Sequence, residues 1–274
     1  MNKSLLASAV LLSLLPAAHA DISVTTTSFT YSENFDTLTT IPTPTAPATA
    51  PAWINDSTLA GWSLFVSTGA AATTYAADNG GSNAGTFRSY GSAGSTERAL
   101  GGAASGGAYF GSPASTAIAG WIAVSFTNNS GATLDGFTLS YSGEQWRNGG
   151  NTNAQPMNFE FGLGATMASV GLWMAPGGGF DFTSPVVGAT AAAVDGNVAG
   201  LVTGLGGSVT SLNWAPGQTL WMRFTERNDL GNDHGLAVDN FSLSVASVVP
   251  EPGSLALLMA GMAAVGALVR RRRG

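Results

Sequence analysis

The sequence offers few residues for nucleophilic catalysis. His234 is the one histidine outside the first twenty residues, and it lies in the segment NDLGNDHGLAVDN among carboxylate and amide side chains. A Ser-His-Asp triad would have to use it, but no G-x-S-x-G motif nominates a serine. A loop histidine that hydrogen-bonds to neighbouring acids explains the same segment. The sequence has no cysteine, which excludes thiol catalysis, zinc–thiolate sites and iron–sulfur clusters.

Carboxylates are the other candidates for chemistry. A glycosidase needs two of them facing its substrate, about 5 to 9.5 Å apart. Glu160 stands alone on the solvent face of the segment MNFEFGLG, and Glu144 and Glu226 lie near the ends of other apolar segments. A catalytic pair from different strands is conceivable, but solvated surface acids are the simpler interpretation. We expect a protein without enzyme activity, and a polysaccharide hydrolase or lyase is the least favoured alternative.

The elements that must position these residues are β-strands. Apolar residues alternate over short runs that are bounded by Gly, Asn, Pro or Ser, which is the strand period. Such one-sided strands cover their apolar faces with one another, so we expect an all-β fold, an antiparallel β-sandwich. The apolar faces expected to point inward are Ile122, Val124 and Phe126; Phe137, Leu139 and Tyr141; Met157, Phe159, Phe161 and Leu163; Leu220, Met222 and Phe224; and Phe241, Leu243 and Val245.

One domain is expected to span residues 21–249. Within it, the proline-rich stretch 42–51 and the Gly-, Ala- and Ser-rich stretch 67–116 are expected to be long surface loops, the second of them mobile or partly ordered. Residues 21–249 contain fifteen acidic residues, five arginines and no lysine, a net charge of 5 − 15 = −10. Such a surface repels nucleic acid and anionic lipid, so we exclude a nucleic-acid partner.

The first twenty residues are expected to be a signal peptide. Lys3 supplies a positive start, Leu5–Leu15 form a short apolar stretch, and Ala18-His19-Ala20 has the small-x-small pattern of a cleavage site. The expected partners are therefore the Sec translocon and signal peptidase, and the expected fate is export across the inner membrane.

The C-terminal segment VPEPGSLALLMAGMAAVGALVRRRRG combines three features. Pro250, Glu251 and Pro252 come first, and the uncharged stretch 254–269 follows. As a helix its sixteen residues span about 24 Å, which is enough for a thin membrane region when flanking arginines snorkel. An ordinary membrane anchor is one interpretation, and a buried helix is a weaker one. The basic residues that would stay on the cytoplasmic side are Arg270, Arg271, Arg272 and Arg273.

This segment resembles the PEP-CTERM sorting signal of bacterial exported proteins. That signal has a Pro-Glu-Pro motif, a short transmembrane helix and a terminal arginine cluster, in this order. The resemblance implies an exosortase-type membrane protease as partner and cleavage near Pro250–Pro252 of a segment 250–274. It also implies a Gram-negative host, transient anchoring by the C-terminal helix, and a final location at the cell surface or outside the cell, in exopolysaccharide or biofilm.

The two ends of the sandwich also resemble a known family. SENFDTL followed by LAGWSLF, and the closing segment GLAVDNFSLSV, are similar to the ends of jelly-roll carbohydrate-binding modules of the galactose-binding-like type. The resemblance implies a jelly-roll-like sandwich and an alternative function, the binding of extracellular polysaccharide. Many such modules hold a structural calcium between the first and last strands, which makes Glu33, Asp36 and Asp239 the matching candidates here.

The strand parity of Asp239 gives the calcium hypothesis a physical basis. Asp239 has the parity of Phe241, so a strand that begins at Asp239 would point the carboxylate toward the core, where it needs a cation or several donors. Alternatively the strand begins at Asn240, and Asp239 lies in a polar turn. The segment NDLGNDHG has suitable oxygens for calcium without the EF-hand spacing. No other cofactor is expected.

Three residues have parity opposite to the apolar sets of their strands. Trp121, Trp221 and Arg223 are expected on outer sheet faces, where aromatic rings with an arginine could form a platform for sugars. Long loops that cover these tryptophans are the alternative. Trp146 and Arg147 have the same ambiguity.

Overall fold

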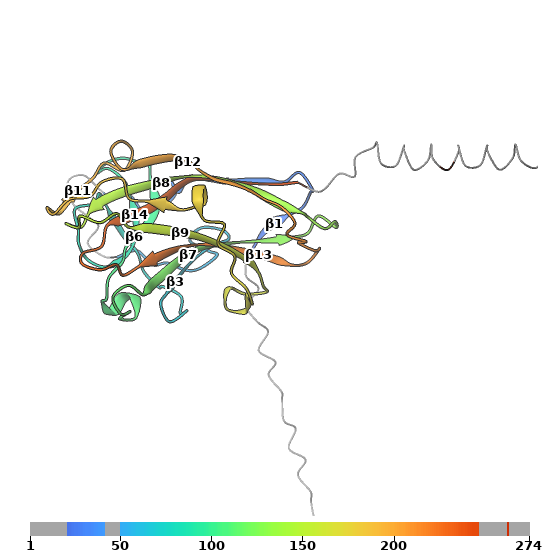
Figure 1. The fold of residues 1–274 in the computed structure, drawn as a ribbon, viewed down its shortest axis with the longest axis horizontal. Coiled ribbons are helices and arrows are strands. Elements are labelled where there is room, and N and C mark those ends of the chain that lie inside the picture. Colours follow the sequence, from blue (N-terminus) through green and yellow to red (C-terminus); the bar gives the residue numbers. More distant parts are fainter. Residues whose placement is uncertain (1–20, 42–49, 247–261, 263–274) are drawn as a thin grey trace, which may run out of the picture.

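The fold is a β-sandwich of two sheets (Figure 1). The computed structural model describes residues 21–41, 50–246 and 262. One sheet has six strands: β1 (Ile22–Val24), β3 (Trp62–Val66), β7 (Ile118–Asn128), β9 (Pro156–Leu163), β10 (Phe182–Thr183) and β13 (Thr219–Arg227). The other has eight: β2 (Thr30–Glu33), β4 (Ala76–Asp78), β5 (Thr86–Tyr90), β6 (Ala99–Ala103), β8 (Gly136–Asn148), β11 (Ala192–Ala193), β12 (Leu201–Val209) and β14 (Gly235–Ala246).

The longest strands lie at the centres of the two sheets, and short strands share their edges. In the six-stranded sheet the order is β1-β7-β13-β9-β10, and β3 also pairs with β7. In the eight-stranded sheet the order is β11-β8-β14-β6-β5-β4, with β12 on β8 and β2 on β14. The pairs β1–β7 and β4–β5 are parallel, and the other ladders are antiparallel. Three short 3-10 helices complete the described elements: η1 (Ala108–Phe110), η2 (Met167–Ser169) and η3 (Gly178–Phe180).

The core lies between the sheets, and it contains the apolar faces expected from the alternating segments. The inward residues of β7, β8, β13 and β14 are all buried there, as are Met157, Phe159 and Phe161 of β9. The five expected strands and their inward faces are therefore confirmed, apart from Leu163, which is only partly buried against the core. Period-two alternation identified them because one face of each strand packs against the opposite sheet.

The stretch 67–116 differs from the expected surface loop. It contributes β4, β5 and β6 to the eight-stranded sheet, and Phe87 of β5 is fully buried. Its glycines permit close strand packing: a Cβ on Gly101 would lie 2.0 Å from the carbonyl oxygen of Leu236 on β14. Small residues occupy these positions because the neighbouring strand leaves no room for larger ones. A prediction from composition interprets the same abundance of small residues as a loop.

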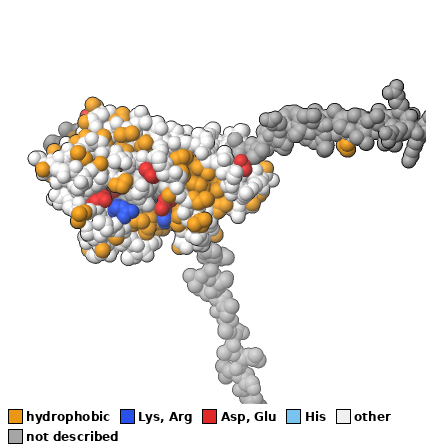
Figure 2. Space-filling view, in the orientation of Figure 1, with side chains coloured by type: hydrophobic (Ala, Val, Ile, Leu, Met, Phe, Trp, Pro, Cys, Tyr) orange, Lys and Arg blue, Asp and Glu red, His pale blue; other side chains and the backbone are white. Residues whose placement is uncertain are grey.

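Other expectations fall on residues that lie outside the described part of the chain. These are the signal peptide at 1–20, most of the proline-rich stretch 42–51, and the C-terminal helix with its flanking motifs. Among the described residues, no helix is long and apolar enough to span a membrane. The visible face carries scattered hydrophobic patches and few charged side chains (Figure 2).

Candidate functional site: an aromatic pocket with a stacked arginine

The strand register of the six-stranded sheet gathers aromatic residues on its outer face. Trp121 of β7 pairs with Phe65 of β3 on one side and with Thr225 of β13 on the other. Two positions along β13, Arg223 pairs with Glu160 of β9. Residues directly opposite in a ladder share a face, so these side chains project away from the core. The structure thus places Trp121, Trp221 and Arg223 on the side that their parity indicates.

Arg223 is the centre of this group. Its Nε and Nη2 lie 2.7 and 2.6 Å from Oε2 of Glu160. Its guanidinium carbon lies 3.7 Å from the ring centroid of Trp173 and 5.1 Å from that of Trp121. Burial lowers the pKa of Arg223, and the contact with Glu160 opposes this. The guanidinium remains charged at neutral pH, so it makes cation–π contacts with both indoles.

Trp173 reaches the pocket through the segment that follows β9. Thr166 and Ser169 form a reciprocal capping box around η2, which fixes the start of this segment. Met174 then exchanges two backbone hydrogen bonds with Phe161, 2.8 and 3.0 Å long, on the edge of β9 that does not pair with β13. Sequence reasoning missed Trp173, because GLWMAPGGG has no alternation that signals an element.

The pocket has a volume of about 300 Å³ and mostly apolar walls. This volume is at the lower end of the usual range for small-molecule sites, about 300–1,000 Å³. Trp221 forms its floor: it is 1% exposed, and its Nε1 donates to the carbonyl oxygen of Gly164. Trp121 and Trp173 are partly exposed, and Leu172, which precedes Trp173 in the sequence, is 71% exposed. The lining residues are Phe65, Gly69, Trp121, Thr166, Met167, Ala168, Val170, Trp173, Trp221 and Arg223.

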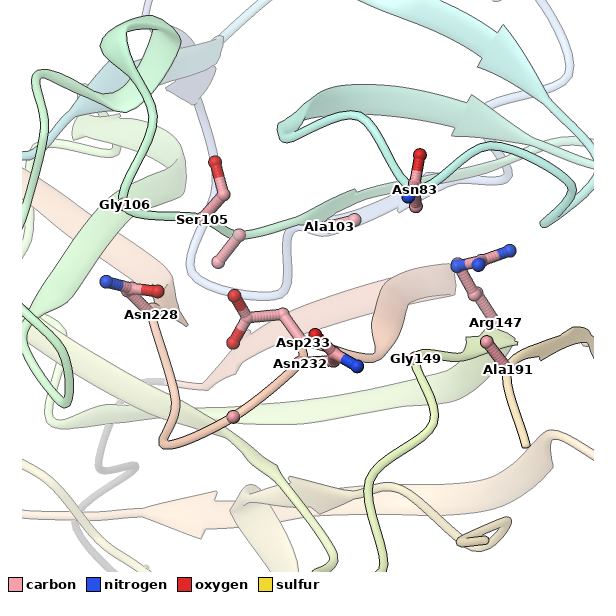
Figure 3. Close-up of a pocket in the computed structure, with 12 residues that line it drawn as sticks. Asn83, Ala103, Ser105, Gly106, Arg147, Gly149, Ala191, Asn228, Asn232 and Asp233 are labelled. Atoms are coloured by element: carbon pink, nitrogen blue, oxygen red, sulfur yellow. The ribbon is translucent and has the colours of Figure 1, made fainter. Parts of the chain in front are cut away.

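A second pocket, of about 310 Å³, is polar (Figure 3). Asn228, Asn232 and Asp233, from the loop between β13 and β14, line it together with Arg147 of β8. Asp233 Oδ1 accepts the backbone N–H of Asp229 at 2.6 Å, and burial raises the pKa of Asp233 to about 7. This is the NDLGNDHG segment, and the carboxylate of Asp233 takes part in the hydrogen bonding of the loop itself.

His234 is buried in the same region and makes two fixed contacts. Its Nδ1 accepts the backbone N–H of Gly149 at 3.0 Å, so Nε2 carries the proton and faces the carbonyl oxygen of Asn153 at 3.2 Å. Burial lowers the pKa of His234. With both ring nitrogens engaged by the backbone, His234 has the geometry of a structural histidine.

The three glutamates considered for catalysis lie in three different places. Glu160 is on the outer face of the six-stranded sheet, where it pairs with Arg223. Glu226 has the parity of Phe224 and lies between the sheets, near Gly102 of β6. Glu144 is on the outer face of the eight-stranded sheet, opposite Ala237 in the ladder. No two of them flank a common space, so they do not form a pair.

Trp146 and Arg147 are covered by other parts of the chain. The Trp146 ring stacks on Tyr90 with centroids 6.1 Å apart and planes 2° apart, and loop residue Gly196 lies against it. Arg147 donates to the carbonyl oxygens of Gly80 and Gly81. Neither side chain presents an open platform.

The expected calcium ligands are placed as follows. Glu33 Oε1 accepts the backbone N–H of Phe35 at 2.8 Å, and Asp36 Oδ1 accepts that of Arg98 at 3.0 Å. Asp239 is 3% exposed, and its carboxylate lies in a group with Glu97 and Glu144, which does not include Glu33 or Asp36. Three carboxylates that the sequence places far apart could therefore hold a cation.

The parity of Asp239 predicted that its carboxylate points toward the core. This prediction is wrong. The ladder between β14 and β8 shifts register between Asp239 and Ser242, and Asn240 has a φ of 49°. This β-bulge reverses the parity of β14. Val238 and Phe241 face the core on either side of the bulge, so Asp239 faces outward and is buried by other segments.

Comparison with known proteins adds one decisive observation at the C-terminal end. Residues 248–273 match the PEP-CTERM protein-sorting motif. The PEP-CTERM motif implies an exported protein that is sorted by an exosortase, with a membrane-anchoring signal at its C-terminus. Pro250, Glu251, Pro252 and the arginines at 270–273 lie within the matched range and outside the described residues.

The comparisons say less about the residues that precede this motif. A search of curated proteins finds no match. Among solved structures, the sandwich is similar to the CBM22-1 xylan-binding domain from Paenibacillus barcinonensis Xyn10C. The identity is 8% and the TM-score 0.39, over 82% of this chain and 99% of that one.

Proposed function

We propose that the protein is a non-catalytic, exosortase-processed protein whose β-sandwich binds neutral polysaccharide outside the inner membrane. The PEP-CTERM motif supports the route, and the aromatic pocket supports the binding. In this proposal the tail anchors the chain briefly, an exosortase cuts near Pro250–Pro252, and the body is released to the cell surface or the extracellular matrix of a Gram-negative bacterium.

The stacked arrangement of Arg223 and Trp173 is the observation that carries the binding proposal. The ion pair with Glu160 holds the guanidinium in place, and the guanidinium makes cation–π contacts with both indoles. Rigid aromatic faces at a pocket rim suit pyranose rings, because the C–H faces of a sugar pack against them without the entropic cost of ordering a flexible side chain.

The charge of the protein favours a neutral ligand. Arg223 is neutralised by Glu160, and residues 21–249 contain fifteen acidic residues and five arginines. Such a surface repels polyanions such as uronic acid polymers. We therefore place neutral polysaccharides above acidic ones as ligands.

Affinity electrophoresis of the exported protein tests the binding. Gels containing hydroxyethyl cellulose, galactomannan, dextran or the host's own exopolysaccharide should retard it in at least one case, and alginate should not. Trp173→Ala should reduce retardation at least fivefold, because it removes one wall of the pocket. Leu172→Ala, a neighbouring change at a side chain that is 71% exposed, should leave it unchanged.

Two results would contradict the binding proposal. One is unretarded migration in every polysaccharide, and the other is an equal loss of retardation in the Trp173 and Leu172 variants. The sorting route is tested separately by deleting residues 250–274 and fractionating the cells. An unchanged location and an unchanged mass of the mature protein would contradict exosortase processing.

A further inference from the structure

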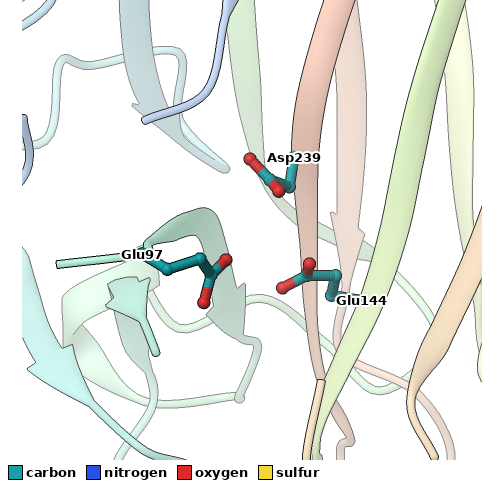
Figure 4. Close-up of side chains that lie close together, drawn as sticks. All are labelled: Glu97, Glu144 and Asp239. Atoms are coloured by element: carbon teal, nitrogen blue, oxygen red, sulfur yellow. The ribbon is translucent and has the colours of Figure 1, made fainter. Parts of the chain in front are cut away.

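Three carboxylates converge on the outer face of the eight-stranded sheet, on the opposite side of the sandwich from the aromatic pocket. Glu144 comes from β8, Asp239 from β14, and Glu97 from the segment that leads into β6. One oxygen from each lies within 4.8 Å of the others, and Figure 4 shows the side chains turned toward a common space. We call this group the carboxylate cluster.

The strand ladders build the cluster. Ala237 pairs with Glu144 and with Gly101, and Asp239 pairs with Ser142. Because the residues opposite Glu144 and Asp239 are small, neighbouring segments can close over the two carboxylates. The bulge at Asn240 turns Asp239 to this face, and Glu97, two residues before Ala99, approaches from the side.

Each carboxylate has one oxygen held by a nitrogen donor. Trp146 Nε1 donates to Glu144 Oε2 at 2.7 Å, Asn197 Nδ2 to Glu97 Oε2 at 2.6 Å, and Asn240 Nδ2 to Asp239 Oδ2 at 2.6 Å. Hydrogen bonds of this kind orient carboxylates around metal ions. They leave the second oxygen of each carboxylate for another contact.

Two of these second oxygens are buried and have no hydrogen-bond partner. They are Oδ1 of Asp239, whose residue is 3% exposed, and Oε1 of Glu97. Glu144 is 1% exposed. A buried carboxylate without a partner is costly, so a cluster of three calls for a positive charge or for protons.

No described arginine forms an ion pair with the cluster. Among residues 21–41 and 50–246, the ion pairs are Arg88 with Asp78 and Arg223 with Glu160, neither of them in the cluster. Arg98 follows Glu97 but points to the other face, where its Nε donates to the hydroxyl of Ser89 at 2.9 Å. Arg98 therefore acts on Glu97 only through the attraction between the two charges, and it is within ion-pair distance of no carboxylate in the cluster.

We propose that Glu97, Glu144 and Asp239 bind one calcium ion. Calcium takes oxygen ligands at about 2.3–2.6 Å, so ligands of one ion lie at most about 5.2 Å apart, and three oxygens within 4.8 Å of one another can share one calcium ion. Magnesium usually keeps several waters and binds through one or two carboxylates, so a group of three protein carboxylates suits calcium better. Water fills the remaining coordination positions, and Asp36 lies near enough for its charge to act on Asp239.

The proposed ion joins segments that are distant in sequence. It ties the segment before β6 to the central strands β8 and β14. Outside the cell, calcium reaches about the millimolar level at which extracellular modules bind it, with dissociation constants of about 10⁻⁴–10⁻³ M. The inference is independent of polysaccharide binding, because the two sites lie on opposite outer faces.

Calcium titration of the full exported chain, first treated with EDTA, tests the proposal. Calcium at about 1 mM should raise the melting temperature in a saturable way, and magnesium should do so much less. Terbium should show luminescence on tryptophan excitation, because the indole of Trp146 is hydrogen-bonded to Glu144, and calcium should displace it. Asp239→Asn should weaken both responses at least tenfold.

The control is Glu160→Gln, which changes an acid on the opposite outer face and should leave both responses intact. If Asp239→Asn does not fold, Glu97→Gln replaces it, since Glu97 is the least buried of the three. A melting temperature that is indifferent to EDTA and calcium, or variants that titrate like the parent protein, would overturn the site and indicate that shared protons neutralise the cluster. An equal response to magnesium would overturn the assignment to calcium.

Discussion

The guanidinium carbon of Arg223 lies 3.7 Å from the ring centroid of Trp173, while Nη2 of the same arginine lies 2.6 Å from Oε2 of Glu160. The planar head therefore has an aromatic face on one surface and a carboxylate at its edge. Lysine has no planar head to stack on the ring and no pair of N–H donors fixed along one edge, because its ammonium is a compact point charge. The shape of this pocket depends on the identity of the cation as well as on its charge.

Arg223→Lys should lower the free energy of unfolding by about 1 kcal/mol, the usual size of a partly exposed cation–π contact. Urea denaturation followed by circular dichroism measures this change. Arg227→Lys is the matched control: it lies at the end of β13, where Arg227 Nη1 donates to the carbonyl oxygen of Thr116. If Arg227→Lys lowers the free energy of unfolding as much as Arg223→Lys does, the stacking on Trp173 does not contribute to stability.

Stability should depend on pH through Glu226, which is buried between the sheets. Burial, and next the charges of Asp233 and Asp229, raise the pKa of Glu226 from 4.5 to about 8. The folded state therefore holds a proton that the unfolded state releases between these values, so the stability from Glu226 is complete below about pH 4.5 and declines as the pH rises toward 8.

Glu226→Gln removes this titration. The stability of the variant relative to the parent protein should improve by about 1–3 kcal/mol between pH 5 and pH 8, as measured by urea denaturation at both values. Any cost of packing the amide is common to the two pH values and cancels in the difference. If the stability of the variant relative to the parent protein is the same at pH 5 and pH 8, Glu226 is ionised in the folded protein at both pH values.

The bulge at Asn240 should be sensitive to side-chain branching. Asn240 has a φ of 49°, a conformation that asparagine and glycine adopt readily and β-branched residues avoid. Asn240→Val should cost about 1–3 kcal/mol, and Asn240→Gly much less. Ser242→Val, at an exposed position two residues further along β14, is the control and should be tolerated. Equal stabilities of the Asn240→Val and Asn240→Gly variants in thermal unfolding would contradict the bulge.

The same bulge explains why the sequence predicted the strands better than the cluster. Alternation identifies a strand wherever the period of two continues unbroken, as from Phe137 to Tyr141. Alternation assigned Asp239 to the same face as Phe241, which is wrong. The inserted residue at the bulge reverses the parity of the strand, and the amino-acid sequence shows no pattern that marks it. Burial of Asp239 could be anticipated, but its neighbours could not, since Glu97 and Glu144 are 47 residues apart and meet only through the β-sheet.

The residues of the aromatic pocket were likewise predicted only in part from the sequence. Trp121, Trp221 and Arg223 lie on strands, so their parity was sufficient to place them on an outer face. Trp173 lies on a segment with no regular period, and it reaches the pocket because Met174 pairs with the edge of β9. Side chains on irregular segments depend on long-range contacts, which a local pattern does not encode.

Composition was misleading for residues 67–116, and one glycine tests the reason. At Gly101 of β6 an added Cβ would lie 2.0 Å from the carbonyl oxygen of Leu236 and 2.6 Å from the Cα of Ala237. The strands would have to separate, so Gly101→Ala should destabilise the protein by about 2 kcal/mol or more. Gly171→Ala is the control, because nothing lies within 4 Å of an added Cβ there. Urea denaturation curves that show no difference between the two variants would mean that β6 is not packed against β14, and that this stretch is the loop its composition indicates.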